Sequence, residues 1–184
     1  DIDFENARQS YNRFFVSYLR TFSRLGLKAI PMAADTGPIG GDLSHEFLVL
    51  AETGESELAC HKDFISMDLG TETINFENDL QHIVNRFTQL YAATDEKRDL
   101  EMEKELGNDL ITARGIEVGH IFHFGDKYAK PFNATLAKKS GEQVAVSMGS
   151  YGIGVSRLVG AIIEASHDDA GIVWPEAVAP FRIG

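Results

Sequence analysis

The sequence predicts an α+β fold in which an antiparallel β-sheet is flanked by helices. Three observations support this fold class. An amphipathic helix pattern opens the chain, several strand patterns joined by short turns follow Gly115, and an apolar helix pattern begins at Gly154. Strands that follow one another through short turns pair antiparallel, and the two helices can cover such a sheet with their apolar faces.

The first 25 residues predict a helix of about six turns, because apolar residues recur at steps of three and four. These residues are Phe4, Ala7, Tyr11, Phe14, Phe15, Tyr18, Leu19, Phe22 and Leu25. Gly26 is a plausible end for the helix. A regular aromatic stripe of this kind is typical of a buried core rather than of a ligand site, so we interpret the helix as scaffold.

Two strands are predicted next, over residues 27–32 (LKAIPM) and 46–52 (EFLVLAE), with a glycine-rich loop over residues 34–44 between them. Ser44, His45 and Glu46 form a polar cluster where the second strand begins. Adjacent residues of a strand point to opposite faces, so His45 and Glu46 are poorly arranged for a shared metal ion or an acid–base pair.

Residues 57–114 predict a small, mainly helical insertion between two parts of one domain, 1–56 and 115–184. Residues 75–110 show helical spacing and alternating charge, which favours solvated helix faces. At the start of the insertion, His61 follows Cys60 but lacks the further cysteine or histidine partners of a zinc site.

Further strands are predicted over residues 116–125, 132–138 and 144–150, with a turn at 138–143. His120 and Phe122 share a face of the first of these strands. Glu117 and His120 are three positions apart and face opposite sides, unless the glycine at 119 introduces a bulge.

A glycine-rich turn that runs into an apolar helix is the most informative segment. Gly149, Gly152 and Gly154 leave room for a ligand beside the backbone, and Arg157 lies on the first helical turn. Helical side chains lean toward the helix N-terminus, so this guanidinium can join the free N–H groups there in binding a phosphate or carboxylate. The spacing alone equally fits a tight turn that caps a core helix, with Arg157 as an ordinary surface charge.

Composition excludes several classes of protein. The net charge of −11 argues against general binding to nucleic-acid phosphates, and no apolar run is long enough to span a membrane. The first residues lack the features of a secretory signal, and the single cysteine excludes an internal disulfide. We therefore expect a cytoplasmic globular protein.

Four segments resemble bacterial prolyl-tRNA synthetases, which are class II aminoacyl-tRNA synthetases, in their order and spacing. They are GDLSHEF (41–47), EVGHIFHFGDKYAKPFNAT (117–135), MGSYGIGVSRLVGAIIE (148–164) and DDAGIVWPEAVAPF (168–181). The resemblance implies an internal part of the catalytic domain, without motifs 1 and 2 and without a full-size editing insertion. We expect this part alone to be inactive.

The resemblance also implies roles for individual residues. Arg157 would be the catalytic arginine of motif 3 and a ligand of the ATP polyphosphate. Gly152, Gly154 and Glu117 would border the ATP, and Glu117 would also be a possible Mg²⁺ ligand.

The proline pocket would be bordered by His120, Phe122, Ser150 and His45. Relatives often have cysteine where Ser150 stands, so no thiol is expected to serve this pocket.

The implied activity is ATP-dependent formation of prolyl-adenylate, followed by transfer of proline to the 3′ end of tRNA(Pro). ATP and Mg²⁺ would be the cofactors, and the partners would be L-proline, tRNA(Pro), a second copy of the chain and a free-standing editing protein. Two alternatives remain open: a non-catalytic module that binds nucleotide or tRNA, and an amino-acid ligase that loads another carrier.

Overall fold

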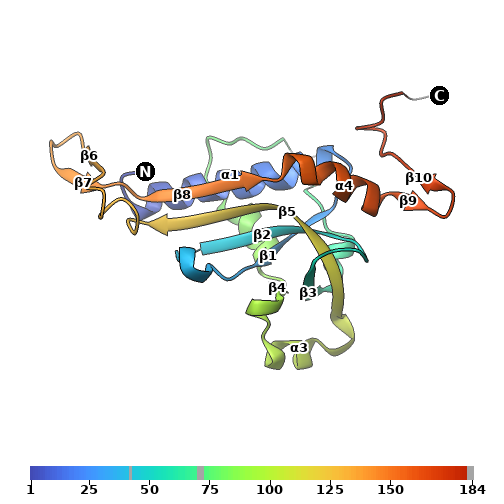
Figure 1. Cartoon of the computed structure of the whole chain (residues 1–184). Helices are drawn as coiled ribbons and strands as arrows, with labels where there is room; N and C mark the ends of the chain where they lie inside the picture. Colours follow the sequence, from blue (N-terminus) through green and yellow to red (C-terminus); the bar gives the residue numbers. More distant parts are fainter. Residues whose placement is uncertain (42, 70–72, 182–184) are drawn as a thin grey trace.

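The computed structural model describes residues 1–41, 43–69 and 73–181. Among these residues, one six-stranded sheet dominates the fold and helices cover one of its faces (Figure 1). The predicted α+β class is confirmed. Small parts of the predicted loop (residue 42), insertion (70–72) and last domain segment (182–184) lie outside the described residues.

The central sheet has the strand order β2-β1-β4-β3-β5-β8. Its strands are β1 (Ala29–Ala33), β2 (Leu43–Leu50), β3 (Ser56–His61), β4 (Ala92–Thr94), β5 (Leu110–Gly125) and β8 (Met148–Ile153). Neighbouring strands are antiparallel except β1 and β4, which are parallel. The first part of β5 pairs with β3 and the second part with β2 and β8, so this long strand curls the sheet.

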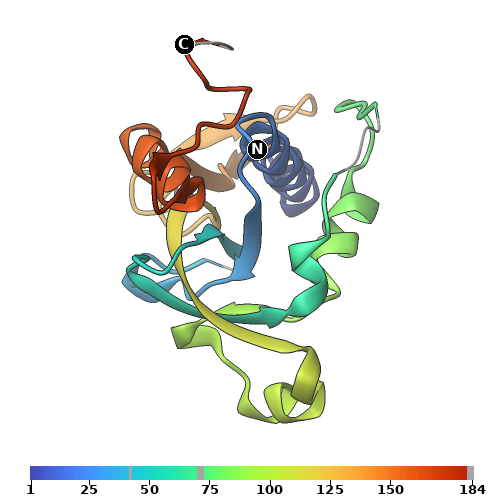
Figure 2. The ribbon, with the colours of Figure 1, turned by 90° about the vertical axis from the view of Figure 1, so that its right-hand side faces the viewer.

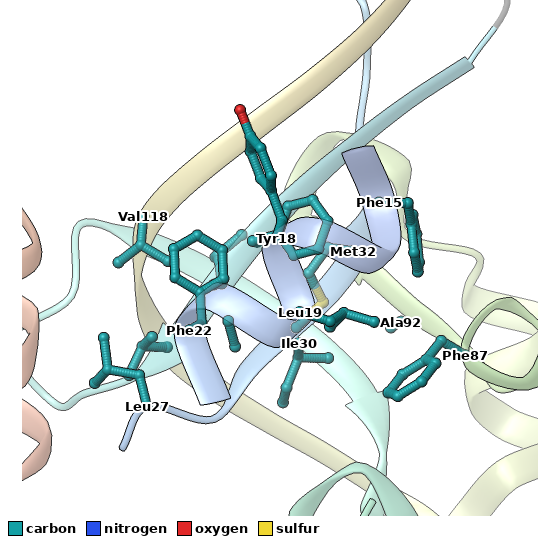
Figure 3. Close-up of a cluster of buried hydrophobic side chains, with 14 of the residues drawn as sticks. Phe15, Tyr18, Leu19, Phe22, Leu27, Ile30, Met32, Phe87, Ala92 and Val118 are labelled. Carbon is teal, nitrogen blue, oxygen red and sulfur yellow. The ribbon is translucent and has the colours of Figure 1, made fainter. Parts of the chain in front are cut away.

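Helix α1 (Phe4–Arg24) supplies most of the aromatic core, as the apolar spacing predicts. Phe15 and Phe22 are fully buried, and both contact Phe47 of β2 at ring-centroid distances of 5.5 and 5.8 Å. Figure 3 shows side chains of α1 packed against Ile30 and Met32 of β1. Burying one such side chain stabilises the fold by about 2 to 3 kcal/mol, so this interface anchors the sheet.

Residues 57–114 contain two α-helices, α2 (Gln81–Thr88) and α3 (Leu100–Leu106), but also the strands β3 and β4 of the main sheet. This differs from the predicted helical character. Apolar residues of both strands are completely or almost completely buried, for example Ala59 and Ala93. The division into 1–56 plus 115–184 with an insertion between them stays a prediction about domains.

The predicted strands after residue 125 are shorter than expected and partly leave the main sheet. Strands β6 (Thr135–Ala137) and β7 (Gln143–Ala145) form a separate hairpin, which projects from one end of the molecule in Figure 1. The predicted strand 144–150 is divided between β7 and β8. The peptide N–H of Ser147, between the two, donates to the carbonyl oxygen of Asp1 over 2.9 Å, which explains the break.

Helix α4 (Val155–Ala165) follows β8 directly, as predicted, and lies on the same side of the sheet as α1 (Figure 2). A short hairpin of β9 (His167–Asp168) and β10 (Gly171–Ile172) comes next. Single turns of 3-10 helix occupy Gly37–Ile39, Lys62–Ile65, Asp95–Lys97 and Gly107–Asp109. In the described part of the chain, no helix is long and apolar enough to cross a membrane.

Candidate active site

Most of the predicted site residues lie on one face of the sheet, where β2, β5 and β8 are neighbours. Residues that pair across antiparallel strands share a face. Glu46 pairs with His120 and Ser44 with Phe122, while His120 and Phe122 also pair with Gly152 and Ser150 of β8. We call the side of the sheet that carries these residues the site face. It is turned away from α1.

A bulge in β5 brings Glu117 to the same face as His120. Phe47 pairs with Gly119 and Leu48 with Glu117, so Val118 is the extra residue. As a result, the Glu117 Oε1 atom lies 3.5 Å from His120 Nδ1. The sequence allows a bulge near Gly119, and the structure contains one. The side chains of Glu117 and His120 therefore lie on the same face.

The imidazole of His120 is contacted on several sides. Its Nε2 atom lies 2.7 Å from the Ser44 hydroxyl oxygen. Its Nδ1 atom lies 3.6 Å from a carboxylate oxygen of Glu46, in addition to Glu117. The ring also stacks on Phe122 with a centroid distance of 3.7 Å. His120 thus lies at the centre of the site face.

The two carboxyl groups beside His120 have opposite pKa shifts. Burial raises the pKa of Glu46, and the negative charge of Glu117 adds to this shift. The pKa of Glu117 is lowered, chiefly through its interaction with His120 and also by Arg157. Glu117 is more exposed than Glu46, and Arg157 lies beside it, so the charged form of Glu117 is favoured.

Arg157 reaches the site face from the first turn of α4. Its Nη1 atom donates to the Glu117 carbonyl oxygen over 3.0 Å and lies 3.4 Å from the Glu117 carboxylate and 3.3 Å from that of Glu55. The helix start is held nearby, because the Gly154 N–H donates to the carbonyl oxygen of Val118. The Arg157 side chain is 49% exposed, so a ligand can reach it from solvent.

Of the three glycines expected to leave space, only Gly152 does so, because a Cβ atom at Gly149 would clash with the Tyr151 hydroxyl. A Cβ atom at Gly152 would have no neighbour within 4 Å, so the region above His120 is open on this side. At Gly154 a Cβ atom would lie 3.2 Å from the Cβ of Arg157, which is tighter than most such contacts. Ser150 is exposed and lies across from Phe122.

An open, acidic cavity of ≈ 470 Å³ adjoins these residues. Glu46 and Glu117 line it together with Glu55, Glu57, Asp95, Glu96, Ser56, Thr94 and Arg114. Six carboxylates in one cavity favour cations over anions. Within residues 1–41, 43–69 and 73–181, however, no three histidine, cysteine, aspartate or glutamate side chains are grouped so that they could hold a metal ion.

His45 does not lie with the other predicted proline-pocket residues. Its ring is on the opposite face of β2, where Nδ1 is 2.7 Å from the Tyr11 hydroxyl and the ring contacts Phe15 edge-on. Tyr151 is also on the α1 side, stacked on Phe14 at 3.8 Å. The strand period explains both placements, because His45 and Tyr151 are adjacent in sequence to site-face residues.

Glu55 and Thr94 are parts of the site region that the sequence does not single out. Both belong to the 50–114 part of the chain and approach the site only through long-range packing. Neither carries a local pattern that could have identified it. Ser44 and Glu46, by contrast, stand in the polar cluster visible in the sequence.

Comparison with known proteins identifies the family of the chain. A family model described as "tRNA synthetase class II core domain (G, H, P, S and T)" matches residues 3–166. Proteins named proline–tRNA ligase from Parvibaculum lavamentivorans and Rhodospirillum rubrum are each 61% identical to the chain, and one from Mesorhizobium japonicum is 60% identical.

These three alignments include 100% of the chain but only 42% of each relative, so the chain spans less than half the length of the relatives it matches. The match to the family model covers most of the chain, including every residue of the site face described above. The chain therefore belongs to the family of class II tRNA synthetase core domains.

Proposed function

We propose that this chain is the C-terminal half of the catalytic domain of a proline–tRNA ligase. The observation that carries the proposal is an identity of about 60% over the whole chain with proteins of that name. In the reaction, the carboxylate of proline attacks the α-phosphorus of ATP in line with the leaving pyrophosphate. Positioning and electrostatic stabilisation dominate such a reaction, so no nucleophilic side chain is required.

Arg157 would bind the ATP polyphosphate, and Gly152 and Gly154 would let the nucleotide approach the backbone. The exposed side chain of Arg157 lies at the N-terminus of α4. A guanidinium and a helix N-terminus both favour anions, which supports this role. In place of the Glu55 and Glu117 carboxylates beside it, Arg157 would bind phosphate oxygens.

Mg²⁺ would be held by Glu117 together with ATP. Mg²⁺ in such sites takes one or two carboxylates plus phosphate oxygens, so the carboxylate of Glu117, whose charged form is favoured, fits this requirement. When bound, the ion would neutralise charge on the polyphosphate. Glu117 would also keep Arg157 oriented through its carbonyl oxygen.

Proline would lie on the site face near His120, Phe122 and Ser150. The stacked rings of His120 and Phe122 offer a flat surface for the apolar pyrrolidine ring, and the open space above Gly152 leaves room for it. His45 is excluded from direct contact with this surface by its position under α1. We therefore retain three of the four predicted pocket residues.

The complete protein would transfer proline to tRNA(Pro) in the cytoplasm and act as a homodimer, as the resemblance implies. The 184-residue chain alone would be inactive, because the attack geometry requires ligands from both halves of a site.

Charging assays distinguish this proposal from its two rivals. The complete protein is incubated with ATP, Mg²⁺, tRNA and each amino acid in turn, and aminoacylated tRNA is measured. Charging with proline alone supports the proposal. Absence of both charging and adenylate formation would favour a non-catalytic module, and adenylate formation without transfer to tRNA would favour a ligase for another carrier.

A further inference from the structure

Ser44 and His120 form the shortest contact among the polar side chains of the site face. The Ser44 hydroxyl oxygen lies 2.7 Å from His120 Nε2, and the two residues belong to neighbouring strands. Ser44 is only 8% exposed. A buried hydroxyl with one partner has little freedom to turn elsewhere, so this bond fixes one edge of the imidazole ring.

The surroundings of the ring determine which nitrogen carries the proton. Nδ1 faces the carboxylate oxygens of Glu46 and Glu117 at 3.6 and 3.5 Å, and ionised carboxylates only accept hydrogen bonds. The tautomer with hydrogen on Nδ1 avoids a lone pair against these oxygens. In the neutral ring Nε2 is then the acceptor, and the Ser44 hydroxyl donates to it.

Both nitrogens of His120 are thereby engaged by the protein, and one ring face is covered by Phe122. The remaining open side is the one toward Gly152. A ligand can therefore reach the ring only from this side, and only while Ser44 and the carboxylates hold the ring in this orientation. Without the Ser44 hydroxyl, rotation of the ring would disturb its stacking with Phe122.

We propose that Ser44 is a positioning residue, which holds the His120 ring in one orientation and so fixes the His120–Phe122 surface on which the amino-acid substrate lies. The inference rests on the proposed function for the identity of that substrate. The order serine, histidine, carboxylate also occurs in enzymes with a nucleophilic serine. Ser44 differs from such a nucleophile because it is a buried residue within strand β2.

The first test measures the ring directly and needs no activity. The ¹⁵N shifts of His120 are recorded in the complete protein with labelled histidine and assigned with a His120→Gln variant. For the wild type we expect an Nε2 resonance that reports the hydrogen bond with the Ser44 hydroxyl. Ser44→Ala should shift the Nε2 resonance, and Ser44→Thr, which keeps the hydroxyl, should restore it.

The second test measures proline-dependent exchange of pyrophosphate into ATP. Ser44→Ala should raise KM for proline about tenfold, the scale for losing one hydrogen bond in a site, while KM for ATP changes less than about twofold. Ser44→Thr should recover most of the loss. A purely structural defect would instead lower the fraction of active protein and would not raise KM for proline more than KM for ATP.

Tyr11→Phe provides a matched control, because Tyr11 and His45 form a second hydroxyl–imidazole pair with the same 2.7 Å distance on the opposite face. This variant should leave the His120 shifts and KM for proline unchanged. Unaltered His120 shifts in Ser44→Ala, unaltered KM for proline, or covalent labelling of Ser44 by a fluorophosphonate would each overturn the proposal. If the wild type activates no proline, the proposed function fails, but the ¹⁵N result still decides the role of Ser44.

Discussion

At the scale of single residues, Arg157 shows how protein oxygens occupy the position proposed for an anion. Oxygen atoms of Glu117 and Glu55 surround its guanidinium, and the neighbouring cavity is acidic. A phosphate must therefore displace carboxylates from Arg157, which favours binding together with a divalent cation.

The position of Arg157 at a helix start could be predicted from the sequence. Its partner Glu55 could not, because that contact spans about a hundred residues of chain and depends on the curl of the sheet.

Replacement of Arg157 should abolish most of the activation step. Arg157→Ala in the complete protein should lower proline-dependent pyrophosphate exchange by roughly 100-fold or more, the scale for loss of one key electrostatic group. Arg157→Lys should recover little, because lysine lacks the forked donor geometry. Near-normal exchange in both variants would exclude the polyphosphate role.

His45 should make the protein sensitive to acid. Burial lowers its pKa to about 4, from an ordinary value of about 6.5, with a smaller contribution from His120. The unfolded chain therefore binds a proton between these values that the folded chain does not, so this stability is complete above about pH 6.5 and is lost as pH falls toward 4.

Urea unfolding at pH 7 and pH 4.5 tests this. The wild type should lose roughly 2 kcal/mol more between the two conditions than His45→Gln, which does not titrate. Equal losses in both proteins would show that His45 is protonated in the folded state.

At the scale of elements, the two long helices and the strands beside them could be predicted, because their periodic patterns extend over several turns or alternations. Strands β3 and β4 were missed as parts of the main sheet. Strand β4 has only three residues, and β3 pairs with β5 across a long stretch of intervening chain, so no local pattern identifies their partners. The bulge in β5 is an intermediate case: Gly119 allows it, but the pairing with β2 decides it.

Replacing two glycines by alanine, one at the end of α1 and one inside α4, should change the stability of the protein in opposite directions. Gly26 ends α1 with φ of +77°, and a Cβ atom there would lie 2.6 Å from Pro175. Gly26→Ala should destabilise the protein by at least about 1 kcal/mol. Gly160, inside α4, has nothing within 4 Å of a Cβ atom, so Gly160→Ala should stabilise by roughly 0.5 to 1 kcal/mol. Unfolding midpoints in denaturant measure both changes; shifts of the same sign would contradict this interpretation.

At the scale of the whole molecule, the segment 57–114 shares its strands with the central sheet. Its residues therefore contribute to the main core, and the described part leaves little chain for a separate hydrolytic domain with its own pocket. The sequence indicates this through length alone. The pairing of β3 and β4 with the central sheet supports the same conclusion, but it depends on tertiary contacts that the sequence does not show.

We expect that the complete protein does not clear alanine from tRNA(Pro) and relies on a free-standing editing protein. A pocket for proline discriminates poorly against a smaller apolar side chain, so such clearance would otherwise need a second site. Alanyl-tRNA(Pro) is incubated with the protein and released alanine is measured. Release well above the rate in buffer would refute the prediction.

The central claim is that the site face of β2, β5 and β8, together with the start of α4, holds prolyl-adenylate. A crystal structure of the complete protein with a non-hydrolysable sulfamoyl analogue of prolyl-adenylate tests it most directly. We predict the pyrrolidine ring on the His120–Phe122 surface and the nucleotide beside Gly152 and Gly154, with Arg157 turned toward the nucleotide and the adjoining polyphosphate site. An analogue bound elsewhere, with Arg157 still held by Glu55 and Glu117, would contradict the account.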